Sequence, residues 1–186
     1  MTLTFILFII LSLTFSAFFS GMEIAFISAN KLKIELDNKS GDWSAKILSF
    51  FSKKPAWFIA SMLIGNNVAL VIYSIYMADL LYPTLFALGF SNTWILFFQT
   101  IFSTFFILIF AEFLPKAIFR LNPNTVLKAF SIALVILYFI LWPITFLVVS
   151  LSNFILICFG KNGDKRDEIS FRKTDLDQYL EELKKD

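Results

Sequence analysis

The chain has 186 residues, of which 58% are hydrophobic and 25 are phenylalanine. This composition is too apolar for a soluble domain of this length, and it predicts an integral membrane protein. The formal net charge is only +2. The sequence has no histidine and a single cysteine, which excludes a disulfide framework and a zinc, haem or other soft-metal site within one chain. Any metal chemistry must therefore use oxygen ligands.

The first apolar run, about residues 3–29, has no basic residue before it and is followed by Lys31 and Lys33. It is longer than the apolar part of a signal peptide, so we expect a retained first membrane span. The polar stretch after it carries six lysines and three acids. The positive-inside rule therefore predicts that this loop is cytoplasmic and that the N-terminus lies outside.

The second and third apolar runs, about residues 57–78 and 94–119, are each long enough for one crossing. Residues 79–93 between them contain no lysine or arginine, and their only charged residue is Asp79. This loop is predicted to lie outside. Lys116 and Arg120 then predict that the third span ends on the cytoplasmic side.

The fourth run, about residues 126–159, is flanked by Lys128 and by Lys161. Both ends are predicted to be cytoplasmic, and Pro143 near the middle favours a re-entrant or juxtamembrane helical hairpin. The alternative is a fourth crossing, which would put the basic tail outside. The predicted fold is all-α and integral to the membrane, with three transmembrane helices and this hairpin in residues 1–160. Residues 161–186 are predicted to be a charged cytoplasmic linker that leads to a soluble domain.

Polar residues follow one face of the first span. Their spacings of 4, 4, 3 and 7 place them in a narrow arc of a helix: Ser12, Ser16, Ser20, Glu23 and Asn30. The serines alone could serve helix packing. An acid such as Glu23 within or near the hydrocarbon costs roughly 2.5 kcal/mol or more unless it faces a cavity or a partner.

The second span contains the sequence LIGNNVAL, with Gly65, Asn66 and Asn67 near the predicted midplane. Adjacent amides on a helix point in different directions, so at most one of the two is expected to face a given site. The alternative for either asparagine is a hydrogen bond between helices.

The third span ends in FAEFLPKAIFR, which contains Glu112, Pro115 and Lys116. Pro115 has no N–H to donate to the carbonyl of Ala111, so a backbone oxygen is expected to be free beside Glu112. The alternative is a salt bridge between Glu112 and Lys116 one turn away, although Lys116 can equally extend to the headgroups.

Four of these residues are expected at a similar depth, between the midplane and the inner third of the bilayer, on three different helices: Ser16, Ser20, Asn66 and Glu112. Hydroxyl, amide, carboxylate and carbonyl oxygens form the hard ligand set that Mg²⁺ accepts. The residues themselves do not distinguish Mg²⁺ from Ca²⁺, Mn²⁺ or Na⁺.

The joint order of SAFFSGMEIAFIS, GNN and EFLPK resembles the transmembrane domain of the CorC/CNNM family of magnesium transporters over about residues 3–160. The resemblance implies three spans and a juxtamembrane hairpin in a homodimer, followed by a cytoplasmic CBS-domain pair that binds nucleotide. It also implies Na⁺-coupled Mg²⁺ export. A stripe of small residues in the first span, Ala17, Gly21 and Ala25, likewise predicts close packing against another helix.

Carried over by motif, the resemblance implies a Mg²⁺ site formed by Ser16, Ser20, Gly65, Asn66 and Glu112. Support for the ion path is expected from Glu23, Asn67, Pro115 and Lys116. The chain departs from the family at Leu70, where a further asparagine is often found, and this leaves a sodium-linked role of that position in doubt.

The predicted function is divalent-cation transport in a bacterial inner membrane, with membrane lipid as surroundings. The rival hypothesis is a non-transporting membrane subunit that anchors a larger machine, because the composition also resembles a gliding-motility-associated member found in Bacteroidetes. An enzyme is not expected, since no nucleophile with a neighbouring base is found in the sequence. No nucleic-acid partner is expected either.

Overall fold

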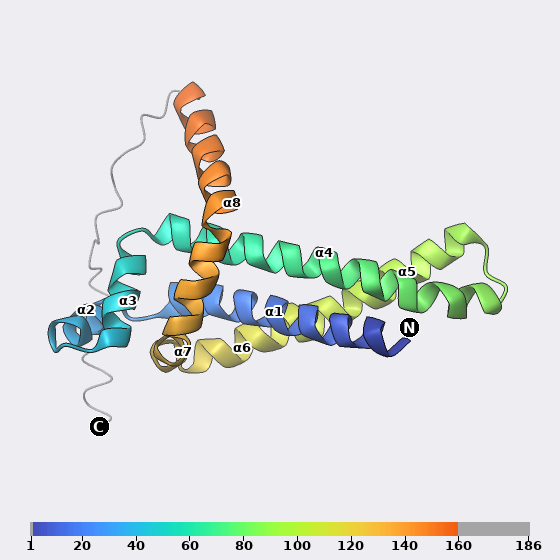
Figure 1. Ribbon diagram of the computed structural model, residues 1–186, viewed down its shortest axis with the longest axis horizontal. Helices are drawn as coiled ribbons and strands as arrows, with labels where there is room; N and C mark the ends of the chain where they lie inside the picture. Colours follow the sequence, from blue (N-terminus) through green and yellow to red (C-terminus); the bar gives the residue numbers. More distant parts are fainter. Residues whose placement is uncertain (1, 160–186) are drawn as a thin grey trace. The chain divides into compact units, whose positions relative to one another are not determined.

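The computed structural model describes residues 2–159, and within them every regular element is a helix (Figure 1). This confirms the predicted all-α membrane fold. The charged segment 161–186 lies outside the described residues. In chain order the helices are α1 (Thr2–Ser28), α2 (Lys31–Lys39), α3 (Trp43–Ser52), α4 (Pro55–Ala87), α5 (Asn92–Phe106), the π-helix η1 (Ile107–Phe113), α6 (Leu114–Leu121), α7 (Pro123–Ala129) and α8 (Ser131–Cys158).

Four helical stretches among the described residues are long and apolar enough to cross a membrane, one more than the three spans predicted. The first two are α1 and α4, and the third is the continuous stretch Asn92–Leu121 formed by α5, η1 and α6. The fourth is α8. The chain is therefore a multi-pass membrane protein.

The helical hairpin expected around Pro143 is not formed, because α8 runs through this residue as one helix of 28 residues (Figure 1). No glycine, asparagine or aspartate lies within eight residues of Pro143 to make a turn. Membrane helices tolerate an internal proline, since nearby groups satisfy the freed backbone. Beside it, the hydroxyl of Thr145 donates to the carbonyl of Leu141 at 3.0 Å.

The chain divides into two compact units, of which the first contains Met1–Met22 and Gly65–Leu121. Its core at one end consists of Ile9, Tyr73 and Met77, and Ile107 packs against this cluster. Polar contacts join α4 to the third span, because the side-chain amide of Gln99 donates to the carbonyl of Ala78 at 2.9 Å.

One residue of the small-residue stripe in α1, Gly21, packs closely against another helix within this first unit. A Cβ atom added at Gly21 would lie 2.7 Å from ring carbons of Phe119 in α6. A larger residue at position 21 would require this ring to shift. Gly21 therefore makes its close approach to another helix of the same chain.

The second unit contains Glu23–Ile64 and Asn122–Asp186. Its helices α2 and α3 form a hairpin with a turn at Gly41, whose φ of +93° favours glycine. The side chain of Asp42 begins α3 by accepting the N–H of Ser44 at 3.0 Å. An aromatic cluster fills the interior, with the ring of Phe51 5.0 Å from that of Phe58 and 5.1 Å from that of Tyr138.

Candidate functional site

The buried polar side chains of α1 and α4 meet in the first unit. The hydroxyl of Ser16 donates a hydrogen bond to Oδ1 of Asn66 at 2.5 Å. Ser16 is completely buried and Asn66 is 7% exposed. The contact puts two oxygen atoms from different helices side by side in the interior of the first unit. It is also the bond that a pure packing role of Asn66 would make.

Gly65 provides the space for this meeting. A Cβ atom at residue 65 would lie 2.5 Å from ring carbons of Phe19, which is far closer than real side chains approach. The backbone of Gly65 has the ordinary negative φ of a helix, so glycine is favoured here for its small size, because a Cβ atom would require the ring of Phe19 to shift. The role of Gly65 as a direct ligand stays a prediction.

Ser20 is the residue of the stripe whose hydroxyl is unused. It is completely buried, and among residues 2–159 its Oγ has no hydrogen-bond partner. By contrast, the hydroxyl of Ser12 donates to the carbonyl of Phe8 at 2.6 Å. A buried hydroxyl without a partner costs about 1–3 kcal/mol. Ser20 lies one helical turn after Ser16, so a ligand at Ser16 and Asn66 would find a third oxygen there.

Two contacts set the position of the third span along α1 in the first unit. Near one end, Ile107 packs against the core cluster that contains Ile9. Twelve residues further along each helix, the ring of Phe119 covers Gly21. The two helices therefore run in the same direction between these contacts.

Glu112 lies within this interval, five residues after Ile107, whereas Ser16 lies seven residues after Ile9. Both residues therefore lie in the middle part of the stretch between the two contacts. Glu112 is partly buried. Within the described part of the chain, its carboxylate makes no hydrogen bond and no ion pair, so the alternative salt bridge with Lys116 is not formed.

The segment that carries Glu112 is a π-helix, which sequence reasoning did not anticipate. In η1 the chain is wider than an α-helix, and the N–H of Leu114 donates to the carbonyl of Ile109, five residues earlier. The ring of Pro115 would clash with the carbonyl of Ala111 in a regular α-helix. Widening of the preceding turn relieves such a clash, and π segments are frequent at functional sites. The proline three residues after Glu112 was the available signal.

Three predicted support residues lie in different surroundings. Asn67 is exposed, on a different face of α4 from buried Asn66. Lys116 is half-buried in α6, and Glu23 belongs to the second unit. Their roles along an ion path stay predictions, and so does the ligand role of every residue in the cluster.

The ligand inventory of the cluster is dominated by neutral oxygen atoms. Within residues 2–159, no group of three or more histidine, cysteine, aspartate or glutamate side chains is close enough to hold a metal ion. A cation bound here would therefore depend on hydroxyl and amide oxygens, with Glu112 as the acid in η1 of the third span. Such a set suits a hard cation that keeps part of its water shell.

Comparison with known proteins identifies the family. The model of the cyclin M transmembrane N-terminal domain matches residues 6–186. The chain is also 29% identical over 167 residues to the UPF0053 inner membrane protein YfjD of Escherichia coli strain K12, an alignment that covers 90% of this chain and 38% of the relative. The chain thus spans well under half the length of that relative. Because the family match covers nearly the whole chain, the protein is a multi-pass membrane protein of the CorC/CNNM family.

Proposed function

We propose that this chain is the membrane part of a divalent-cation transporter, that its substrate is Mg²⁺, and that it works by Na⁺-coupled export. The observation that carries the proposal is the buried oxygen cluster of Ser16, Ser20 and Asn66, in which the Ser20 hydroxyl has no partner among the described residues. An unsatisfied buried hydroxyl does not strengthen a packing contact, whereas its oxygen can serve as a ligand of a cation.

The chemistry of the cluster suits a small hard cation. Mg²⁺ takes oxygen ligands at roughly 2.0–2.1 Å in an octahedron and often keeps several waters. Two hydroxyls and one amide oxygen supply neutral ligands, and Glu112 supplies the charge. In the structure the Ser16 hydroxyl donates its hydrogen to Oδ1 of Asn66. A bound cation would take the place of this hydrogen and be coordinated by both oxygen atoms. The Ser16 hydroxyl would then turn its hydrogen away from the ion.

Other parts of the proposal rest on the family resemblance. Coupling to Na⁺ is one of them, and Leu70 offers no oxygen ligand where the family often has an asparagine. The homodimer and a nucleotide-binding CBS pair after residue 186 are two others. Light scattering of the chain in detergent tests the homodimer. We propose the inner membrane as the location, since the relative YfjD is described as an inner membrane protein.

The test compares Mg²⁺ affinity of the purified chain with that of Glu112→Gln by calorimetry in detergent. The substitution keeps the shape of the side chain and removes its charge. Loss of an outer-shell partner of a metal typically costs 10–100-fold in affinity, so loss of the charged ligand should cost roughly tenfold or more. Asp79→Asn is the matched control, because Asp79 is an exposed acid on α4 of the same unit.

The rival function is a membrane subunit that anchors or assembles a larger machine. The hydrogen bond between Ser16 and Asn66 favours this rival function, because the bond holds α1 against α4 without any bound ion. Under this rival, Glu112→Gln and Asp79→Asn would bind Mg²⁺ as the wild type does, or no Mg²⁺ binding would be measured at all. Either result would move the assignment to the assembly role.

A further inference from the structure

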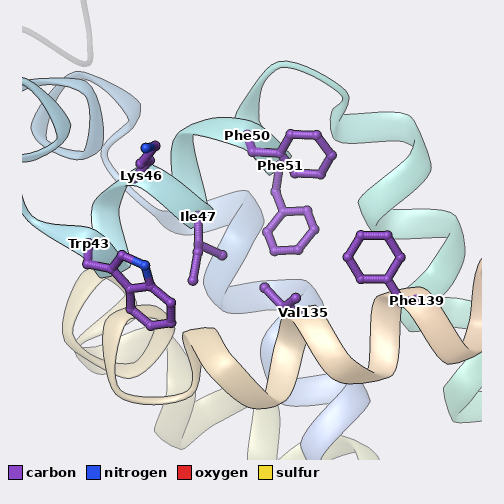
Figure 2. A pocket seen from close by; sticks show the side chains of 7 residues that line it. All are labelled: Trp43, Lys46, Ile47, Phe50, Phe51, Val135 and Phe139. Atoms are coloured by element: carbon purple, nitrogen blue, oxygen red, sulfur yellow. The ribbon is translucent and has the colours of Figure 1, made fainter.

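A pocket of about 340 Å³ opens between α3 and α8 in the second unit (Figure 2). Its lining is almost entirely apolar and comes from α3 on one side and α8 on the other: Trp43, Lys46, Ile47, Phe50, Phe51, Val135 and Phe139. Figure 2 shows Trp43 and Lys46 together at one end of this lining and Phe139 at the other. We call this pocket the α3–α8 groove.

The inner wall of the groove is held by packed aromatic rings. Phe51 is 2% exposed, and its ring contacts the rings of Phe58 and Tyr138, which are also buried. Rings in such a cluster have little freedom to collapse into the space beside them. The groove is therefore a preformed feature of the second unit.

The outer parts of the groove are apolar and yet exposed. Trp43 is 60% exposed, Phe50 48% and Phe139 63%. The opposite face of α3 is packed, with Ala45 and Leu48 completely buried. In a membrane protein, an exposed apolar face beside a short amphipathic helix is suited to contact with lipid chains.

Among the described residues that line the groove, Lys46 is the only charged one. Within residues 2–159 its side chain makes no ion pair and no hydrogen bond. The nearest acid in sequence, Asp42 one turn earlier, accepts a hydrogen bond from Lys128 at 2.8 Å. An uncompensated cation thus stands at one end of an apolar groove, next to a tryptophan.

We propose that the α3–α8 groove binds one anionic glycerophospholipid, with an acyl chain between the two helices and the phosphate at Lys46. The cation complements the phosphate, and tryptophan side chains prefer the headgroup level of a bilayer. The lysine-rich loop that contains α3 is predicted to face the cytoplasm, where anionic lipids attract basic residues. This site does not depend on the proposed transport of Mg²⁺.

The test is native mass spectrometry of the purified chain from detergent micelles that contain equal amounts of phosphatidylglycerol and phosphatidylcholine. We expect one retained phosphatidylglycerol and a preference of about fivefold for it, which corresponds to one lysine near an anionic headgroup. Lys46→Gln should abolish the preference. Lys53→Gln is the matched control, because Lys53 is an exposed lysine at the end of the same helix that does not line the groove.

A second pair of variants tests the acyl-chain part of the proposal. Val135→Trp fills the groove from α8 and should reduce the retained lipid of either kind. Ile136→Trp adds the same ring to the neighbouring residue, which is 55% exposed and outside the groove, and should leave lipid binding unchanged.

Three results would overturn the proposal. The first is equal retention of the two lipids by the wild type, and the second is an equal loss of preference in Lys46→Gln and Lys53→Gln. The third is a change of oligomeric mass in Val135→Trp with lipid retention unchanged, since that would assign the groove to a second copy of the chain.

Discussion

Three serines on one face of α1 use their hydroxyls in three different ways. Ser12 donates to a carbonyl of its own helix, Ser16 donates across to α4, and Ser20 is buried without a partner among the described residues. Serines in membrane helices commonly satisfy their hydroxyls on the preceding turn. The exception at Ser20 is therefore the most informative of the three for ligand binding.

Ser20→Ala should separate function from stability. Because the substitution removes an unsatisfied buried hydroxyl, the free energy of unfolding should stay unchanged or rise by about 1 kcal/mol. The affinity for Mg²⁺ should fall, since one neutral ligand is lost. Thermal unfolding in detergent and calorimetric titration of the same preparation measure the two effects.

Ser12→Ala is the control for this comparison. Its hydroxyl is satisfied within α1, so the variant should keep the affinity of the wild type with a small loss of stability. If Ser20→Ala also keeps the Mg²⁺ affinity, Ser20 is not a ligand.

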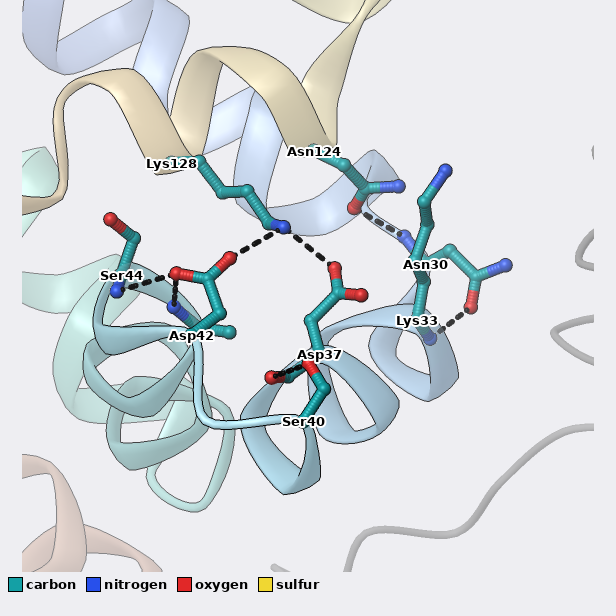
Figure 3. A network of polar contacts seen from close by, with 9 residues as sticks. Asn30, Lys33, Asp37, Ser40, Asp42, Ser44, Asn124 and Lys128 are labelled. Atoms are coloured by element: carbon teal, nitrogen blue, oxygen red, sulfur yellow. Dashed lines mark hydrogen bonds and ion pairs between the residues drawn. The ribbon is translucent and has the colours of Figure 1, made fainter.

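At the scale of elements, a single lysine joins three helices of the second unit. Nζ of Lys128 in α7 lies 2.7 Å from Oδ2 of Asp37 in α2 and 2.8 Å from Oδ2 of Asp42 at the start of α3 (Figure 3). A second contact between these segments is the N–H of Asn30, which donates to Oδ1 of Asn124 at 3.2 Å. The α2–α3 hairpin is thereby tied to α7.

The charges of this contact determine how it responds to pH. Hydrogen bonds to Asp37 and then Asp42 raise the pKa of Lys128 above its usual 10.5, so its contribution is complete below pH 10.5 and is lost as the pH rises through the raised value. The hydrogen bond from Lys128 lowers the pKa of Asp42 below 3.8. The contribution of Asp42 is complete above pH 3.8 and is lost as the pH falls through the lowered value.

Lys128→Met should loosen the α2–α3 hairpin at pH 7, because two aspartates then face each other without the cation between them. Amide hydrogen exchange of residues 31–52 should become severalfold faster than in the wild type. Acidification should have opposite effects on the exchange rates of the two proteins. It should speed exchange in the wild type, because it weakens the contact, and slow exchange in the variant, because it relieves the repulsion between the carboxylates. Comparison of variant and wild type at the same pH removes the chemical effect of pH on exchange.

Lys39→Met is the control, since Lys39 is an exposed lysine at the end of α2 that makes no ion pair within the described residues. It should exchange as the wild type does. Equal rates in Lys128→Met and the wild type at pH 7 would show that the hairpin is held by its aromatic packing alone.

The two prolines of the apolar runs show how far sequence reasoning reaches at this scale. Hydrophobic length predicted the positions of α1, α4 and the third span, because the thickness of a bilayer imposes it. It did not predict that Pro115 follows a π-helix while Pro143 lies in a continuous helix. A proline removes one N–H in either case, and the neighbouring turns decide whether the chain bends, widens or continues.

At the site, helical periodicity placed Ser16 and Ser20 on one face and separated buried Asn66 from exposed Asn67. Periodicity says nothing about partners. Among the described residues the Ser20 hydroxyl makes no hydrogen bond, and the ring of Phe19 lies close to Gly65. Both features depend on which side chains of other segments pack there. These features required the three-dimensional structure.

At the scale of the whole molecule, α8 raises the question of topology. Its first half packs within the second unit through one buried face, with Ser131, Leu134, Tyr138, Leu141 and Thr145. Residues 150–158 are exposed on every side and mostly apolar. A helix that is apolar all round is surrounded by lipid or by protein, so this half of α8 belongs in the membrane or against another chain.

The distribution of charge predicts that α8 does not carry the chain across the membrane. Lys128 precedes it, and Lys161, Lys165 and Arg166 follow it. The positive-inside rule puts both groups in the cytoplasm. The length of α8, 28 residues, would nevertheless allow a fourth crossing, and that crossing would leave the basic segment outside.

Cysteine labelling distinguishes the two topologies. We expect Lys165→Cys, in a Cys158→Ser background, to react with a membrane-impermeant maleimide only after the cells are made permeable. Lys39→Cys, in the loop predicted to be cytoplasmic, should behave in the same way, and Asn92→Cys, in the loop predicted to be outside, should react in intact cells. Reaction of Lys165→Cys in intact cells would mean that α8 crosses the bilayer. A soluble domain after residue 186 would then lie outside, where cytoplasmic nucleotide could not reach it, and the nucleotide-binding partner implied by the family resemblance would have to be given up.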